Sequence, residues 1–320
     1  MDVVSDAISA VRVGRPSADR VRVSGSWSTR LDPYEGAGFH VVLEGGCLLQ
    51  PDGGPPVVLG TGDAVLLPHG TGHVMADDRA DAAALRQAVS YDRWAAAVRQ
   101  PDRDTADEAG EVGRADGAGA VELLCGKYRI DRSRLHPLMA ELPAVVHLPN
   151  RADGHPELRA AIDLLGRELD GGRAGSGIVV PSLLDLLLVY MIRAWTAEAR
   201  TGAWPAALGD TVVAAALRAL HADPAAPWTN ERLAARAGVS RPTLARRFTA
   251  LVGRPPMAYL TWWRLTVTAR LLRDTPDPLA AIARRVGYGT PYALSHAFSR
   301  EFGTTPGRYR AAVAVQAPGG

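Results

Sequence analysis

Four side chains in the first 130 residues of this sequence could bind a metal ion or change oxidation state. Cys47 and Cys125 are too few for a disulfide scaffold, so we expect free thiols, metal ligands or redox sensors. Together with His40 and His73 they would offer two imidazoles and two thiolates, a set that suits tetrahedral Zn²⁺ or a soft Cu(I) site. The thiols could instead oxidise to a disulfide, or all four side chains could be ordinary core residues. The residue types alone leave these interpretations open.

A second chemistry is indicated by charge, which is distributed unevenly along the chain. The formal net charge is only +2, but residues 209–310 contain fifteen arginines against six acidic residues, a net charge of +9. The rest of the chain is therefore acidic. An acidic N-terminal part and a basic C-terminal part indicate that only the C-terminal part binds a polyanion.

The basic part contains an internal repeat with a spacing of fifty residues. Five residues of the first copy recur in the second with identical spacing, as Leu244/Leu294, Phe248/Phe298, Gly253/Gly303, Pro256/Pro306 and Tyr259/Tyr309. Upstream of these, an alanine precedes a glycine by four residues in both copies, as Ala234/Gly238 and Ala283/Gly287. Five residue types in matched spacing indicate two copies of one structural unit.

Each copy has the properties of a helix-turn-helix. The small alanine allows two helices to approach closely, and the glycine can adopt the left-handed conformation that a tight turn needs. Leucine and phenylalanine four residues apart lie on one helix face and pack inward, so the residues between them point outward. Ser240 and Thr290 are good N-caps for these second helices.

A single helix is predicted between the two units, over Pro256 to Asp274. Nineteen residues span about 28 Å at the helical rise. That length is close to the ~34 Å between successive major-groove faces of a duplex. The spacing therefore favours two recognition helices in adjacent grooves of DNA.

Residues 209–310 resemble the AraC/XylS family of regulators. The similarity lies in the segments LAARAGVSRPTLARRFTALVGRPPMAYLTWWRL and IARRVGYGTPYALSHAFSREFGTTPGRYR. The resemblance covers about a third of the chain. It implies a DNA-binding domain with two helix-turn-helix motifs in consecutive major grooves, and RNA polymerase as a partner.

Seven positions would face DNA by this resemblance. They are Arg241, Pro242, Ala245 and Arg246 in the first unit and Pro291, Tyr292 and His296 in the second. Arg246 is the best base reader, because a guanidinium can span O6 and N7 of guanine. The prolines and the alanine offer only apolar contacts. Three further arginines, at positions 247, 264 and 270, are expected to contact phosphates or solvent.

The front of the chain resembles the cupin-type sensor domains that precede such DNA-binding domains. Short alternating runs predict strands between residues 21 and 80, at Val21 to Val23, Phe39 to Leu43, Val57 to Leu59 and Ala64 to Leu67, and again over Val121 to Ile130. Pro101 to Ala120 is predicted to be a mobile loop. GDAVLLPHGTGHVM resembles the closing motif of a cupin barrel, and CGKYRID followed by HPLMAELPAVVHL resembles this subgroup. The usual metal-binding pair of histidines is missing, and Gly38 stands where the motif has glutamate.

Helical periodicity begins at Pro156. One amphipathic helix is predicted over residues 158–169, a second over Ser182 to Ala197 after Pro181, and a linker over Thr201 to Leu208. The second helix is apolar on nearly every side, so a domain core or a dimer partner must cover it. The expected fold class is α+β, a cupin-like β-barrel with a helical hairpin followed by an all-α domain. Its expected parts are residues 1–155 (sensor), 156–200 (dimerisation and linker) and 205–312 (DNA binding).

These features predict a sequence-specific DNA-binding transcription regulator. We expect a homodimer whose cupin domain senses a small molecule, a metal ion (Zn²⁺ or Cu(I)) or a redox signal. The charged N-terminus and the lack of an apolar run of about eighteen residues predict a cytoplasmic protein without a membrane span. A metal-dependent cupin enzyme tethered to DNA is the alternative, and the degenerate metal motif argues against it. An activator that contacts RNA polymerase without an effector is a third reading.

Overall fold

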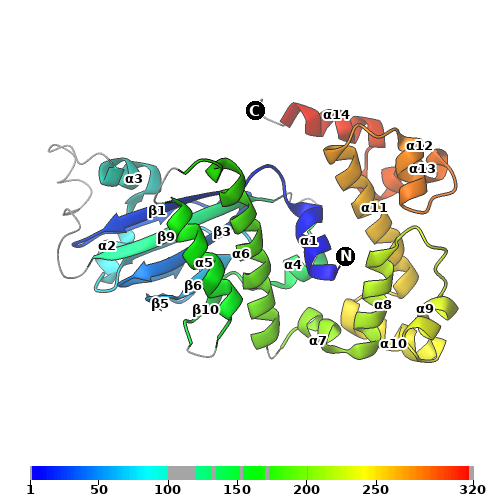
Figure 1. The fold of residues 1–320 in the computed structure, drawn as a ribbon, viewed down its shortest axis with the longest axis horizontal. Coiled ribbons are helices and arrows are strands. Elements are labelled where there is room, and N and C mark those ends of the chain that lie inside the picture. Colours follow the sequence, from blue (N-terminus) through cyan, green and yellow to red (C-terminus); the bar gives the residue numbers. More distant parts are fainter. Residues whose placement is uncertain are drawn as a thin grey trace. The chain divides into compact units, whose positions relative to one another are not determined.

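The computed structural model describes residues 2–99, 120–130, 135–151, 154–169, 173–199 and 201–316. The fold is α+β, with the strands in the first half of the chain (Figure 1). Contacts divide it into two compact units. The barrel unit comprises Val13–Arg132 and Leu142–Trp195, and the helical unit comprises Met1–Arg12, Ser133–Glu141 and Thr196–Gly320. The predicted boundaries at residues 155 and 205 stay a prediction.

The barrel unit is built from two five-stranded sheets. The first has the order β1-β9-β3-β6-β10, with β1 Ser17–Val23, β9 Val121–Arg129, β3 Gly36–Glu44, β6 Ala64–Leu67 and β10 Val146–Leu148. The second has the order β5-β4-β7-β2-β8, with β5 Val57–Gly60, β4 Gly46–Pro51, β7 His73–Asp77, β2 Ser28–Leu31 and β8 Val89–Ser90. Side chains of both sheets share one buried cluster that includes Leu49, Met75 and Leu123.

The central strands of the first sheet are buried on both faces. All residues from Gly36 to Val42 in β3 are buried, because one face meets the shared core and the other is covered by helices. The Tyr128 hydroxyl in β9 donates to the Leu184 carbonyl in the covering helix at 2.6 Å. The predicted strands near residues 21, 39, 57, 64 and 121 are confirmed. Strands β2, β4 and β7 were not individually predicted, and the predicted loop Pro101 to Ala120 lies outside the described residues apart from Ala120.

Helices α2 (Ala82–Arg86) and α3 (Tyr91–Arg99) follow β7, and α5 (Pro156–Leu169) confirms the first predicted helix. The second, α6, spans Ser176–Glu198, so the prediction that it begins after Pro181 is wrong. Proline inside the helix removes the hydrogen bond to the carbonyl of Gly177. The missing hydrogen bond lies close to the start of the helix. The hydrogen bonds of the remaining turns and the packing of the helix against the sheet compensate for it.

Helix α6 is also long and apolar enough to cross a membrane by length and composition alone, so the prediction that the chain lacks such a segment is wrong. Asp185 and Arg193 interrupt its apolar residues. Leu184, Leu187 and Leu188 are buried inside the folded chain. One side of α6 therefore packs against the sheet, although only 33% of its most apolar stretch is buried.

The helical unit contains the two predicted helix-turn-helix copies. Its helices are α1 Val3–Val11, α4 Pro137–Glu141, α7 Ala203–Gly209, α8 Thr211–Ala222, α9 Asn230–Arg236, α10 Arg241–Val252, α11 Pro256–Asp274, α12 Leu279–Arg285, α13 Pro291–Phe302 and α14 Pro306–Gln316. The predicted spacer helix is confirmed as α11. The predicted linker is wrong, because α7 is a helix with Trp204 buried, and the Glu141 carboxylate accepts the Trp204 backbone N–H at 3.1 Å.

The turns and caps of the two copies match the sequence prediction. Gly238 and Gly287, between the two helices of each copy, have φ of 71° and 81°, in the left-handed region. The side chains of Ser240 and Thr290 accept N–H groups of the first turns of α10 and α13. Each copy therefore begins its second helix through the same local interactions.

The two turn glycines predict different responses to the same substitution. A Cβ at Gly238 would meet nothing within 4 Å, whereas at Gly287 it would lie 2.8 Å from backbone atoms of Ala225. We expect Gly238→Ala to cost about 1 kcal/mol of unfolding free energy, from the left-handed conformation alone. Gly287→Ala should cost a further ~1–3 kcal/mol from overpacking. Chemical denaturation of both variants measures this, and equal losses would contradict the predicted close approach at Gly287.

Candidate functional site

The second helix of the first copy, α10, presents a distinct outward face. Leu244 and Phe248 are fully buried and fix the inward face. Arg241, Pro242 and Arg246 are exposed, and Ala245 is half-buried between them. The predicted DNA-facing residues of this copy therefore share one accessible surface.

The matching helix of the second copy, α13, has the same arrangement with different chemistry. Leu294 and Phe298 are fully buried, while Pro291, Tyr292 and His296 are exposed. Tyr292 is 80% exposed, an unusual state for an aromatic ring in a folded domain. The outward face of α13 thus offers an aromatic ring and an imidazole where α10 offers guanidinium groups.

The flanking arginines are held more firmly than the sequence predicted. Arg264 donates to the carbonyls of Pro224 and Ala226, at 2.7 and 3.0 Å. The prediction that Arg264 contacts phosphate or solvent is therefore wrong, because these two hydrogen bonds connect α11 to the loop that contains Pro224 and Ala226. Arg247 lies 3.1 Å from the Asp210 carboxylate, with its side chain 46% exposed. Among the described residues Arg246 makes no such side-chain hydrogen bond or ion pair, so it is the cation best placed to reach a base.

A second polar site lies inside the barrel unit and brings three of the four predicted metal or redox residues together. His40 in β3 and Cys125 in β9 are direct cross-strand partners, so their side chains leave the first sheet on the same face. The His40 Nδ1 lies 3.0 Å from the Cys125 Sγ. The His40 Nε2 lies 2.8 Å from the Nε2 of His73, which belongs to the second sheet.

The protons of this Cys125–His40–His73 chain have one consistent arrangement. The Thr71 carbonyl lies 2.9 Å from the His73 Nδ1 and can only accept, so that nitrogen carries the proton. The His73 Nε2 then accepts from the His40 Nε2–H, and the His40 Nδ1 accepts from the Cys125 thiol. Every group is satisfied with both imidazoles neutral. Burial lowers the pKa of both His40 and His73, which stabilises this neutral state.

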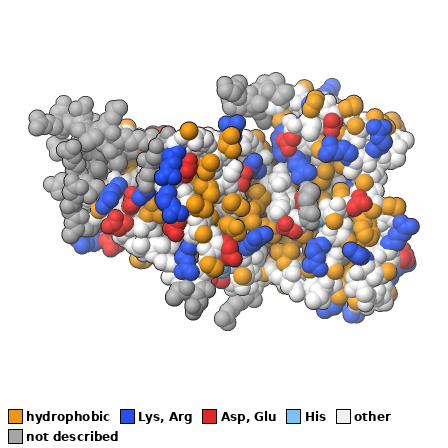
Figure 2. All heavy atoms as spheres, in the orientation of Figure 1, with side chains coloured by type: hydrophobic (Ala, Val, Ile, Leu, Met, Phe, Trp, Pro, Cys, Tyr) orange, Lys and Arg blue, Asp and Glu red, His pale blue; other side chains and the backbone are white. Residues whose placement is uncertain are grey.

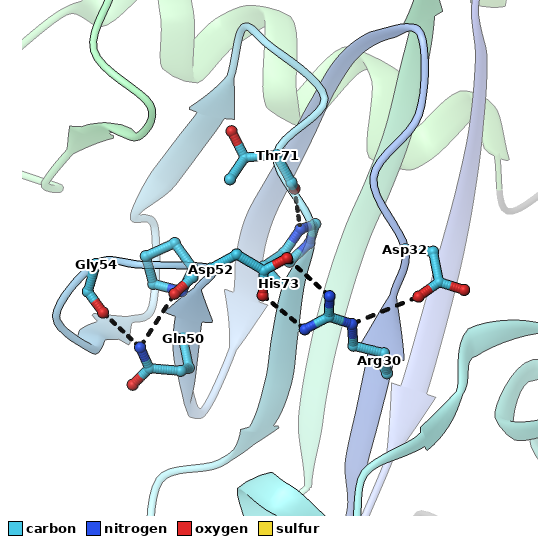
Figure 3. Close-up of polar contacts among 8 residues, drawn as sticks. Arg30, Asp32, Gln50, Asp52, Gly54, Thr71 and His73 are labelled. Carbon is cyan, nitrogen blue, oxygen red and sulfur yellow. Dashed lines mark hydrogen bonds and ion pairs between the residues drawn. The ribbon is translucent and has the colours of Figure 1, made fainter.

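A polar cluster of Arg30, Asp32 and Asp52 lies on the second sheet near His73 (Figure 3). The Arg30 guanidinium makes two 2.7 Å hydrogen bonds to the Asp52 carboxylate and a 3.5 Å ion pair with Asp32. Arg30 helps to lower the pKa of His73, and Asp52 acts in the opposite direction. Sequence analysis did not identify Thr71, Arg30 or Asp52, because a carbonyl contact and a surface ion pair leave no motif.

Cys47 is buried and Cys125 is half-buried, and both thiols are held in the protonated form. Burial raises the pKa of Cys47 to about 12, and burial also raises the pKa of Cys125. Cys47 leaves β4 in the second sheet and belongs to the buried cluster against which Cys125 packs. Both cysteines are free thiols. A protonated buried thiol is a weak nucleophile and a poor metal ligand.

The four predicted ligands do not converge on one point. His40 presents opposite ring nitrogens to Cys125 and His73, so all three cannot face one ion without turning a ring. Among the described residues, no group of three or more His, Cys, Asp or Glu side chains could hold a metal ion. The arrangement therefore does not fit Zn²⁺ or Cu(I) as it stands.

Comparisons with known proteins identify the two domains in which these residues lie. A family model described as cupin matches residues 2–197, and one described as a helix-turn-helix domain matches residues 233–312. A putative AraC-like transcription regulator of Streptomyces antibioticus is 35% identical over 313 residues, covering 97% of this chain and 98% of that protein. A protein of Streptomyces lividans with the same description is 33% identical, with the same coverage.

Among solved structures, the DNA-binding domain of AdpA in complex with a target DNA is 35% identical, with a TM-score of 0.33. It covers 35% of this chain and 99% of that domain. The family assignment rests on the cupin match over more than half of the chain and on the two relatives of nearly full length. This chain belongs to the AraC-like family of DNA-binding transcription regulators and carries a cupin domain ahead of its helix-turn-helix domain.

Proposed function

We propose that this regulator reads specific double-stranded DNA through the outward faces of α10 and α13, and that α10 supplies more of the base specificity. The observation that carries this proposal is the exposure of six of the seven proposed DNA-facing positions, with only Ala245 half-buried, opposite a buried leucine and phenylalanine pair in each helix. The candidate base readers are Arg241, Pro242, Ala245, Arg246, Pro291, Tyr292 and His296.

The two faces support unequal roles. The exposed Arg246 guanidinium can donate two hydrogen bonds to guanine, the commonest specific contact to a base. Arg241 forms an exposed ion pair with Glu231 at 2.8 Å, so DNA would have to displace the Glu231 carboxylate before Arg241 could bind it. Tyr292 and His296 suit stacking, apolar contact or phosphate. The second copy therefore contributes orientation and shape recognition more than hydrogen-bonded readout.

Substitution of Arg246 tests this proposal. We expect Arg246→Ala to weaken binding to the preferred duplex by ~1–3 kcal/mol and to relax the preference at one base pair. Arg246→Lys should restore only part of that preference, because an ammonium on a flexible stem lacks the planar, preorganised fork of the guanidinium. Binding-site selection from a random pool, followed by titration of the selected duplex, measures both. Equal weakening on all sequences, with full rescue by lysine, would instead make Arg246 a phosphate contact.

We further propose that the chain is a homodimer in which α5 and α6 of one copy meet those of another. Hydrophobic side chains gather over these two helices on the surface of the barrel unit (Figure 2). Leu164 in α5 and Ile178, Val179 and Leu186 in α6 are between 39% and 77% exposed. Val179 and Leu186 are two turns apart and so lie on one helix face. Such a contiguous apolar surface is typical of a protein interface.

A charge placed on this surface should separate the copies. We expect Ile178→Arg to convert the dimer to monomer at micromolar concentration, since an unpaired charge would be buried at the interface. Val58→Arg is the matched control, because Val58 is 67% exposed on β5 and lies outside the α5–α6 surface. Sedimentation equilibrium of the full chain gives the masses. A dimer that survives Ile178→Arg, or that Val58→Arg breaks equally, places the interface elsewhere.

The barrel unit is proposed to receive a small-molecule signal. Its protonated thiols disfavour a thiolate-based redox signal, and its ligand arrangement does not fit a metal ion. The Cys125–His40–His73 chain is a polar feature of a largely apolar interior, so a ligand with one hydrogen-bonding group could replace one of its contacts. We further propose that the protein is located in the cytoplasm, contacts RNA polymerase and has no enzymatic activity.

Thiol reactivity separates the small-molecule proposal from a redox signal. A pKa of about 12 for Cys47 reduces its thiolate fraction about a thousandfold relative to an ordinary thiol. We expect both thiols to resist an aromatic disulfide reagent in the native chain at pH 7.5 and to react at once after denaturation. Cys47→Ser and Cys125→Ser assign each reaction. Rapid labelling of either native thiol would favour the redox alternative.

A further inference from the structure

A continuous chain of hydrogen bonds is buried in the helical unit, apart from the DNA-facing surfaces. The His221 Nδ1 in α8 lies 2.9 Å from the Asp6 Oδ2 in α1, and the His221 Nε2 lies 2.8 Å from the Tyr259 hydroxyl in α11. The same hydroxyl lies 3.1 Å from the Nε2 of His136, just ahead of α4. All four side chains are almost fully buried. We refer to Asp6, His221, Tyr259 and His136 as the interlock.

Aromatic rings surround the interlock and exclude water. His221 stacks on Trp263 with ring centroids 4.3 Å apart, and His136 meets the edge of Trp204 at 4.9 Å. In such surroundings an unsatisfied polar group costs far more than it would in water. Each donor in the interlock therefore depends strongly on its acceptor.

The protons of the interlock can be assigned in one direction. The Leu138 backbone N–H donates to the His136 Nδ1 at 3.1 Å, so the proton of neutral His136 is on Nε2. His136 then donates to the Tyr259 oxygen, Tyr259 donates to His221, and His221 donates to the Asp6 carboxylate. With both imidazoles neutral, every donor has its acceptor. Loss of the Tyr259 hydroxyl would leave groups on both histidines unsatisfied.

The interlock includes residues of α1 and of the segment around α4, two segments that are next to barrel strands in the sequence. Helix α1 is followed directly by β1, and α4 lies between β9 and β10, yet both belong to the helical unit. Helix α1 packs on α8, α11 and α4, and Arg273 near the end of α11 lies 3.5 Å from the Ala10 carbonyl. The two segments therefore continue covalently from barrel strands into the core of the DNA-binding unit.

Tyr259 links this core to the first recognition helix. Its ring packs edge-to-face on Phe248 of α10, with centroids 5.7 Å apart. The docked α1 and α4 leave Arg241, Arg246 and Tyr292 exposed. Docking of the two segments is therefore compatible with DNA binding and supports the helix that reads it.

We propose that the interlock makes α1 and α4 integral parts of the DNA-binding unit, and that its closure positions α10 for DNA. This inference rests on the proposed function, because it concerns how the same DNA-reading surface is held. Asp6, His136, His221 and Tyr259 are positioning residues in this scheme. A shift of the barrel strands connected to α1 or α4 would disturb the hydrogen bonds of the interlock. Through the contact of Tyr259 with Phe248, that disturbance would change the position of α10.

The test compares Tyr259→Phe with Tyr309→Phe in the full-length chain. Tyr309 is the repeat counterpart and packs on Phe298 in the same edge-to-face manner, at 5.5 Å. Amide hydrogen exchange at pH 7.5 reports opening of peptides that cover α1 and α4. We expect Tyr259→Phe to accelerate this exchange at least tenfold and Tyr309→Phe to change it less than twofold. Wild-type exchange in Tyr259→Phe, or equal acceleration in both variants, would overturn the interlock.

DNA affinity provides the second measurement. The probe is a duplex selected from a random pool by the full-length wild-type chain. We expect Tyr259→Phe to raise its Kd five- to tenfold, with Tyr309→Phe within twofold of wild type. Faster α1 exchange with unchanged Kd would refute the link to α10. Failure of the wild type to select any duplex would refute the proposed function, while hydrogen exchange would still decide the interlock.

Acid should open the interlock in the wild-type chain. Burial keeps the pKa of His136 well below its ordinary value, so a proton binds this site once it opens below about pH 6.5. The charged and titratable groups around it are Asp6 on α1, Glu141 on α4, His221 on α8, and Tyr259 and Arg254 at α11. We expect α1 opening to rise about tenfold from pH 7.5 to 5.5, with α13 unchanged as internal reference. A flat α1 profile would overturn the assigned protons.

Discussion

The edge-to-face contact between a phenylalanine of each proposed recognition helix and a tyrosine of the next helix is the packing interaction on which the rest of the helical unit depends. Phe248 packs on Tyr259 and Phe298 on Tyr309, at 5.7 and 5.5 Å. Each contact fixes the rotation of its helix, and that rotation decides which residues face outward. The same hydrophobic packing thus sets both the stability and the register of the reading surface. The chemistry of the outward residues can then differ between the two copies without changing the scaffold.

Both units bury histidines and use the same physical solution. Neutral imidazoles both donate and accept, so they can pass hydrogen bonds through an apolar interior. In the barrel unit such a chain runs from the Cys125 thiol to the Thr71 carbonyl. In the helical unit it runs from the Leu138 amide to the Asp6 carboxylate. The two chains tie together parts of the sequence that local periodicity treats as separate.

The parts of the structure that local rules govern could be predicted from the sequence. Glycine at positive φ, serine and threonine caps and the leucine–phenylalanine spacing correctly identified both helix-turn-helix copies and the spacer α11. Long-range contacts could not be predicted. Arg264 looked like a phosphate contact because its carbonyl partners are 38 and 40 residues away. His136 and Asp6 left no signal, since a partner 123 or 215 residues distant has no sequence spacing of its own.

The chain passes between the barrel unit and the helical unit at residues 12, 132, 141 and 195. This has a consequence for building chimeric regulators within the family. A sensor and a DNA-binding domain from two relatives, fused at a single junction near residue 200, would pair the α1 and α4 of one protein with the α8 and α11 of the other. The foreign segments would have to complete a polar chain that evolved with different partners. A graft that also transfers residues 1–12 and 133–141 keeps that chain within one parent.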